Sequence, residues 1–121
     1  MPLTFKQDSL RKIKKGAKTQ TRRTGRNTLQ IGKIYGIVDR WYTKADTYIQ
    51  ITRRFKQRLG DITPKDIRKE GYSSLTEFQA AWIRLHGNWN PNKIVTVYEF
   101  QLAADGEKKN RRRDQTQINQ T

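Results

Sequence analysis

The apolar residues of this sequence occur in short runs separated by polar turns, and this pattern limits the folds that the chain can adopt. Three of the runs, residues 33–41, 47–52 and 94–102, alternate or are rich in β-branched and aromatic residues, which is typical of strands. Short strands joined by glycine-bearing turns favour a small barrel or curled sheet over a parallel α/β sheet. With 121 residues, of which 33% are hydrophobic, the chain can bury one core.

Three further segments, residues 8–16, 63–71 and 74–87, carry helix signals. The first begins at a capping Asp or Ser and ends at a glycine. The second opens on Thr63-Pro64, in which Thr caps the helix and Pro fits its first position. The third opens with the capping box Ser-Leu-Thr-Glu. With short strands at residues 3–5 and 18–23, the order is β-α-β-β-β-α-α-β, which predicts an α+β domain with antiparallel strands.

The apolar pattern ends at Ala104, so we expect the domain to span residues 1–104. Residues 105–121 are polar and basic, which predicts a disordered tail.

Positive charge is concentrated in the first half of the chain. The whole sequence has 26 Lys and Arg against 11 acidic residues, a formal net charge of +15, and residues 1–60 alone hold 16 basic and 3 acidic side chains. Such a field attracts polyanions, and nucleic acid is the commonest one in a cytoplasm. Two other interpretations are general solubility and an anionic membrane surface. The second is disfavoured because no basic amphipathic helix has a broad apolar face.

Several kinds of site are excluded by composition. There is no cysteine, and His86 is the single histidine, so neither a cysteine-ligated zinc nor a multi-histidine centre can form. No apolar run approaches the roughly 20 residues of a membrane span, and the N-terminus has no secretory signal. We therefore expect a cytoplasmic monomer without metal or cofactor.

Aromatic and basic residues outside the helices are candidates for contact with nucleic acid. Trp82 lies on the apolar stripe of its predicted helix and is expected in the core. Trp89 lies in an Asn-rich loop, where its indole either closes one end of the barrel or forms a wall for a base. Trp41 follows a cation at a strand end and would stack on a base. The predicted RNA-binding residues are Arg22, Arg23, Arg26, Trp41, Arg53, Arg54 and Trp89.

The order of several short motifs resembles ASCH domains. Residues 3–5 and a short helix precede Gly16-x-Lys18-x-x-Thr21-x-Arg23, which is similar to the opening signature of that family. The segments 32–35 and 61–72 are similar to its later motifs, and the resemblance covers residues 3–102. It implies a PUA-like fold, a small antiparallel β-barrel with flanking helices and a cleft beside the first helix. It also implies RNA or a modified nucleoside as the ligand.

The resemblance also implies candidate catalytic residues. One bacterial branch of the family comprises small amidohydrolases that deacetylate N(4)-acetylcytidine, and their Lys, Thr and Glu match Lys18, Thr21 and Glu70. Thr21 would attack the amide carbonyl with Lys18 as its base, and Glu70 would orient Lys18 or pass the proton to the leaving amine. Arg23 would stabilise an oxyanion or a phosphate. Arg22 departs from the pattern, because those enzymes tend to have an aliphatic residue there.

Three functions therefore remain open. The first is an RNA-binding module with little or no catalysis. The second is a metal-independent hydrolase using the same cleft, either the amidohydrolase or a ribonuclease that relies on Lys18, Arg23 and Glu70. The third, DNA binding through a helix-turn-helix at residues 61–85, is less favoured because the second helix uses its apolar stripe for the core and presents few basic residues.

Overall fold

The computed structural model describes residues 3–25, 28–40 and 44–103. These residues form five strands, three α-helices and one 3-10 helix in the predicted order. The strands are β1 (Leu3–Thr4), β2 (Gln20–Arg23), β3 (Ile34–Val38), β4 (Thr47–Arg58) and β5 (Ile94–Ala103). The helices are α1 (Gln7–Lys14), η1 (Leu59–Asp61), α2 (Pro64–Lys69) and α3 (Leu75–His86). The predicted site residues Arg26 and Trp41 and the predicted tail lie outside the described residues.

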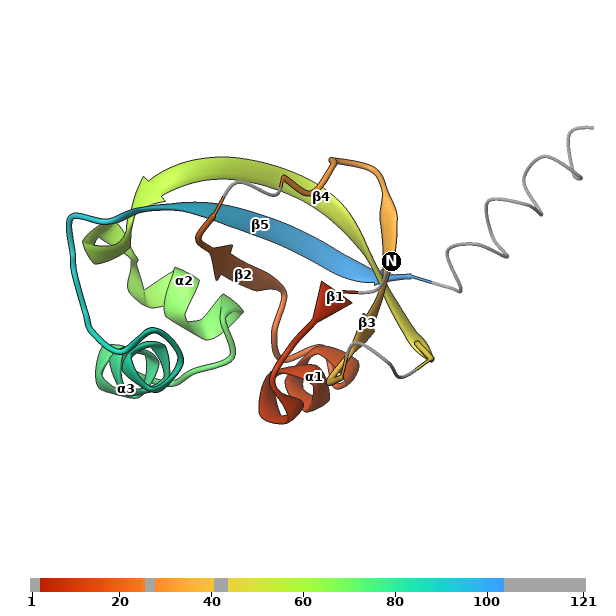
Figure 1. Cartoon of the computed structure of the whole chain (residues 1–121), viewed down its shortest axis with the longest axis horizontal. Coiled ribbons are helices and arrows are strands. Elements are labelled where there is room, and N and C mark those ends of the chain that lie inside the picture. Colours follow the sequence, from red (N-terminus) through yellow and green to blue (C-terminus); the bar gives the residue numbers. More distant parts are fainter. Residues whose placement is uncertain (1–2, 26–27, 41–43, 104–121) are drawn as a thin grey trace, which may run out of the picture.

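The strands form one curled sheet in the order β1-β3-β4-β5-β2 (Figure 1). Three of the pairings among the described residues are antiparallel, as expected, whereas β1 pairs with β3 in parallel. The parallel pair is possible because a long crossover containing α1 and β2 separates these strands in the chain. The predicted α+β architecture is confirmed as a mixed half-barrel whose two edge strands are β1 and β2.

Strands β4 and β5 are the longest in the sheet and pair with each other, and this pair buries opposite faces at its two ends. At one end Ile51 and Phe100 lie in a core cluster with residues of α1 and β3. At the other end Val95 and Val97 pack against Phe78 of α3. Successive side chains of a strand point to opposite faces. The even positions Tyr98 and Phe100 of β5 therefore lie in the first cluster, and the odd positions Val95 and Val97 lie in the second. A shift of register between Ile51 and Arg53 accompanies this change of face.

The starts of α2 and α3 are confirmed, whereas the predicted Asp or Ser cap of α1 is wrong, because α1 begins at Gln7 with Lys6 as its N-cap and no side-chain capping hydrogen bond. In α2 the Thr63 hydroxyl accepts from the Asp66 N–H, and the Asp66 carboxylate accepts from the Thr63 N–H, which completes a capping box. In α3 the Ser74 hydroxyl accepts from the Glu77 N–H. No helix in the described part of the chain has the length and apolar character that a membrane crossing requires. The same residues contain no group of three or more potential metal ligands.

Candidate functional site

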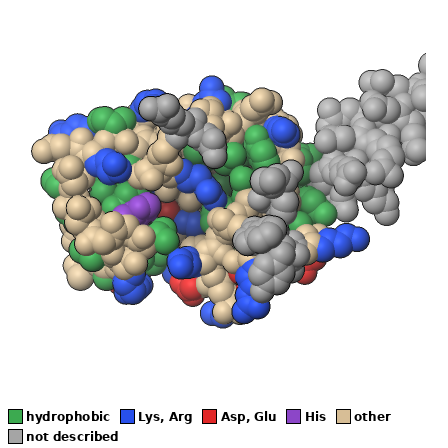
Figure 2. All heavy atoms as spheres, in the orientation of Figure 1, with side chains coloured by type: hydrophobic (Ala, Val, Ile, Leu, Met, Phe, Trp, Pro, Cys, Tyr) green, Lys and Arg blue, Asp and Glu red, His purple; other side chains and the backbone are tan. Residues whose placement is uncertain are grey.

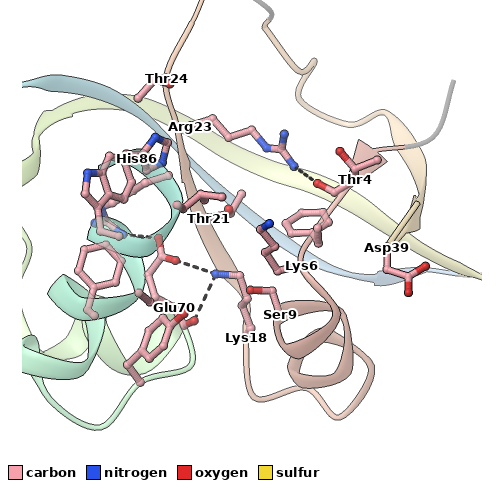
Figure 3. A pocket seen from close by; sticks show the side chains of 17 residues that line it. Thr4, Lys6, Ser9, Lys18, Thr21, Arg23, Thr24, Asp39, Glu70 and His86 are labelled. Carbon is pink, nitrogen blue, oxygen red and sulfur yellow. Dashed lines mark hydrogen bonds and ion pairs between the residues drawn. The ribbon is translucent and has the colours of Figure 1, made fainter. Parts of the chain in front are cut away.

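A cavity of about 390 Å³ opens where β2 approaches α1 and α3. Figure 2 shows this hollow with the histidine on its wall and charged side chains at its bottom, and Figure 3 shows the side chains that line it. Lys18, Thr21 and Glu70 all line this one cavity, so the structure brings the three predicted catalytic residues together. The rest of the lining is Thr4, Phe5, Lys6, Ser9, Arg22, Arg23, Thr24, Asp39, Tyr72, Phe78, Ala81, Trp82, Leu85 and His86.

Local backbone structure explains how Lys18 and Thr21 reach the same cavity. On a regular strand their side chains would point to opposite faces, but β2 begins only at Gln20. Lys18 therefore lies in the turn that follows α1, where Gly16 adopts a positive φ of 79°. The Thr19 N–H donates to the Lys69 carbonyl (2.8 Å), which fixes this turn against the end of α2 beside Glu70.

Glu70 is the centre of a buried ion network. Lys18 Nζ donates to Glu70 Oε1 (2.7 Å), and Arg22 Nη1 donates to Glu70 Oε2 (2.8 Å). All three residues are buried: Lys18 and Arg22 are each 5% exposed, and Glu70 is 3% exposed. Lys18 Nζ also donates to the Glu70 carbonyl (3.2 Å), so it uses two of its three protons within the protein. A buried carboxylate of this kind requires its cations, because an isolated charge in the interior is very costly.

Arg22 connects this network to a second layer of polar residues. Its Nη2 donates to Gln57 Oε1 (2.7 Å) and lies 3.4 Å from Asp66 Oδ2. Burial favours the neutral form of Asp66, but hydrogen bonds from Thr63 and Gln20 and the charge of Arg22 hold its pKa below the usual value. Arg22 lines the cavity, but these contacts are all within the protein, and its guanidinium holds Glu70 in place.

Thr21 differs from its neighbours because its side chain is not engaged. The residue is 8% exposed and lines the cavity, and its hydroxyl has no hydrogen-bond partner within the described parts of the chain. A free hydroxyl beside an ammonium group can donate to or accept from a ligand, and it is also the group that a nucleophilic mechanism requires.

Aromatic side chains form one wall of the cavity. Phe78 and Trp82 of α3 pack with ring centroids 6.1 Å apart, and His86 lies on Trp82 with centroids 3.9 Å apart. Burial and the nearby charge of Lys93 lower the pKa of His86 below its usual value, so its imidazole is mainly neutral at neutral pH. The sequence interpretation missed His86 as a cavity residue. The signal was present, because positions 78, 82 and 86 repeat at a spacing of four and so share one helix face.

The predicted RNA-binding residues that are described fall in different places. Arg23 lines the cavity, where its Nη2 donates to the Thr4 carbonyl (3.1 Å), and burial lowers its pKa. Arg53 and Arg54 are exposed on β4 and do not line the cavity. Trp89 packs edge-on against Phe78 (6.0 Å) in the second core cluster and also does not line the cavity.

Comparison with known proteins supports the fold assignment. No family model matches the sequence, and no curated protein matches it. The structure of an ASCH domain from Lactobacillus crispatus is similar to this chain with a TM-score of 0.68 and 18% identity, covering 78% of this chain and 70% of that one. A DUF984 protein from Enterococcus faecalis has a TM-score of 0.55 and 14% identity, covering 77% of this chain and 68% of that one.

These similarities define the class of fold. The chain has the same fold as the ASCH domain structure, so the fold that its short motifs predicted is confirmed.

Proposed function

We propose that this chain is an RNA-binding domain that takes one nucleotide of its ligand into the cavity beside β2. The observation that carries the proposal is the cavity itself, in which an aromatic wall faces a cluster of hydrogen-bonding groups. Its volume of about 390 Å³ lies within the range of small-molecule sites. A net charge of +15 supplies long-range attraction for a polyanion.

The two walls of the cavity suit the two parts of a nucleobase. Phe78 and Trp82 are only 3% and 6% exposed, so they offer edge contacts, and the exposed ring of His86, which lies on Trp82, offers a face for stacking that tolerates any base. Lys18 retains one unused proton, and the Thr21 hydroxyl is unbonded within the described residues, so both are available to the polar edge of a base. Stacking would provide affinity for a base, and these polar groups would provide its orientation.

The proposal is tested by isothermal titration of the full chain with nucleosides and with single-stranded RNA over a series of salt concentrations. Thr21→Val removes the free hydroxyl and keeps the shape of the side chain, so nucleoside affinity is expected to fall. Thr52→Val makes the same change on β4 outside the cavity and serves as the matched control. The proposal is wrong if wild-type protein binds neither ligand at low salt, or if the two variants bind nucleosides equally well.

A hydrolase acting in the same cavity is the second candidate, and the free hydroxyl of Thr21 favours it. Thr21 Oγ1 would attack the acetyl carbonyl of an acylated exocyclic amine. The C–N bond would break, the amine would leave with a proton, and water would then hydrolyse the acyl-Thr21 ester. The base would be Lys18 after it passes a proton across the 2.7 Å hydrogen bond to Glu70.

Arg22 acts against this hydrolytic step. Its guanidinium lies 2.8 Å from the second oxygen of Glu70 and stabilises the carboxylate, so proton transfer from Lys18 to Glu70 becomes less favourable. For this reason we place RNA binding first and hydrolysis second. Incubation with N(4)-acetylcytidine and chromatographic detection of cytidine tests the hydrolase. Activity that is lost in Thr21→Val and kept in Thr52→Val would support it, whereas no release of cytidine by wild-type protein would exclude this substrate.

A further inference from the structure

We propose that the single-stranded RNA next to the bound nucleotide lies across the outer face of β4 and β5, where Lys56 and Arg58 contact its phosphates. This inference rests on the proposed function and extends it from the cavity to a surface. The partner is an extended, unpaired RNA strand, because the surface is an open strand face that carries cations and apolar atoms side by side.

The alternation of β4 places these cations on the face away from α2 and α3. Phe55 packs against the second core cluster, and Gln57 accepts a hydrogen bond from buried Arg22. Residues 54, 56 and 58 therefore point to the opposite face. All three are exposed. Arg54 donates to the Leu29 carbonyl (2.9 Å) and lies opposite Tyr98, which is 1% exposed, so its guanidinium is engaged within the protein. Lys56 and Arg58 are separated by about 6.8 Å along the strand and form the row of positive charge on this face.

The register of the sheet joins this row to the cavity. Thr96 of β5 lies opposite Lys56 of β4 and also opposite Arg23 of β2. Adjacent strands are about 4.8 Å apart, so the backbone positions of Lys56 and Arg23 are separated by roughly 10 Å. Because Arg23 lines the cavity, a nucleotide held there leaves the neighbouring phosphates within reach of the row.

The chemistry of this face suits a nucleic acid strand. Lys56 has no ion-pair partner in the described ranges, and the residues opposite it and Arg58 are Thr96 and Ile94, neither of them acidic. Arg58 donates to Asn92 Oδ1 (2.6 Å) and lies 3.6 Å from Asp61, but these contacts are exposed to solvent, and exposed ion pairs are weak. Ile94 is 55% exposed and provides apolar surface beside the cations.

Arg53 shows why the register matters for this assignment. The irregularity after Ile51 places Arg53 opposite Glu99, whose carboxylate lies 3.6 Å from its guanidinium. Glu99 also accepts from Gln20 on the side of the sheet that holds the buried network. Arg53 therefore belongs to the other face, although it is adjacent to Arg54 in the sequence.

The test measures the fluorescence anisotropy of labelled single-stranded RNA of roughly 12 nucleotides. This length lies within the site sizes of β-sheet domains that bind single-stranded nucleic acid. The full-length chain, the double variant Lys56→Gln/Arg58→Gln and the control Lys65→Gln/Arg68→Gln are compared. The control removes the same charges from exposed positions of α2. Between about 50 and 200 mM salt, each lost phosphate contact on a single strand makes the negative slope of log affinity against log salt shallower by roughly 0.7.

The expected result is a slope that is shallower by about 1.4 in the β4 variant and nearly unchanged in the control. Nucleoside binding, measured by titration calorimetry, should be the same in both variants. Equal slopes in the two variants, or duplex RNA that binds as tightly as the single strand, would overturn the surface assignment while nucleoside binding upholds the cavity. Failure of wild-type protein to bind either ligand would overturn both proposals.

Discussion

Replacing Arg22 by methionine provides a strong test of the buried network. Methionine has a similar length and is apolar, so the change removes the charge and the hydrogen bonds but largely preserves packing. Glu70 would keep Lys18 as its only close cation among the described residues, and Gln57 would lose its donor. The substitution therefore leaves the Glu70 carboxylate, which is only 3% exposed, with one of its two charged hydrogen-bond donors.

The expected cost follows from burial. Removing one partner of a buried ion pair typically costs about 3–5 kcal/mol, because the other charge stays desolvated. An exposed pair contributes roughly 0–1 kcal/mol. The side chain of Arg22 is 0% exposed and that of Glu70 is 4% exposed, so the larger range applies. A small domain has a total stability of about 5–15 kcal/mol, so Arg22→Met should remove a substantial part of it.

Urea unfolding followed by tryptophan fluorescence measures this change, since the chain has three tryptophans. Arg84→Met, at an exposed position of α3, serves as the control and should change stability by less than about 0.5 kcal/mol. Glu70→Gln alone should also destabilise, and the double variant should cost less than the two single variants together. A loss below about 1 kcal/mol for Arg22→Met, or strictly additive costs, would refute the argument that the network is a coupled, desolvated unit.

Three further predictions concern single positions. Thr63→Ala removes the hydroxyl that caps α2 and should cost about 1 kcal/mol in urea unfolding, whereas Thr63→Ser should cost much less. The His86 resonances, which no other histidine obscures, should titrate in NMR with a midpoint below the value of about 6.5 seen in the unfolded chain. Because the pKa of His86 is lower in the folded state, its contribution to stability is complete above that unfolded value and declines as the pH falls below it; an equal or higher midpoint would contradict the assignment. Gly60→Ala would place a methyl group 2.7 Å from the Pro91 Cβ and should cost about 1–3 kcal/mol by overpacking, while unchanged stability would contradict the close approach of these two residues.

Local signals in the sequence were sufficient for the order of the elements. The caps at Thr63 and Ser74 and the alternation of β5 depend on neighbours within four residues, so they can be recognised without a fold. The parallel pairing of β1 and the register shift after Ile51 depend on contacts between distant segments, and no local pattern encodes them. The site divides in the same way. Lys18 and Thr21 follow from a compact motif, but Gln57 and Glu70, two of the partners of Arg22, lie 35 and 48 positions away.

The donors that remain unused in the cavity restrict which chemical group enters beside Glu70. Both oxygens of that carboxylate already accept from cations, and Lys18 retains one proton. The neighbouring Thr21 hydroxyl donates or accepts according to its partner. A carbonyl oxygen placed between Lys18 and Thr21 would accept from both groups, whereas an amino group there would oppose the ammonium donor. An unsatisfied buried donor costs about 1–3 kcal/mol, so we expect nucleosides that present a carbonyl at this point to bind roughly 10-fold or more tightly than analogues that lack it.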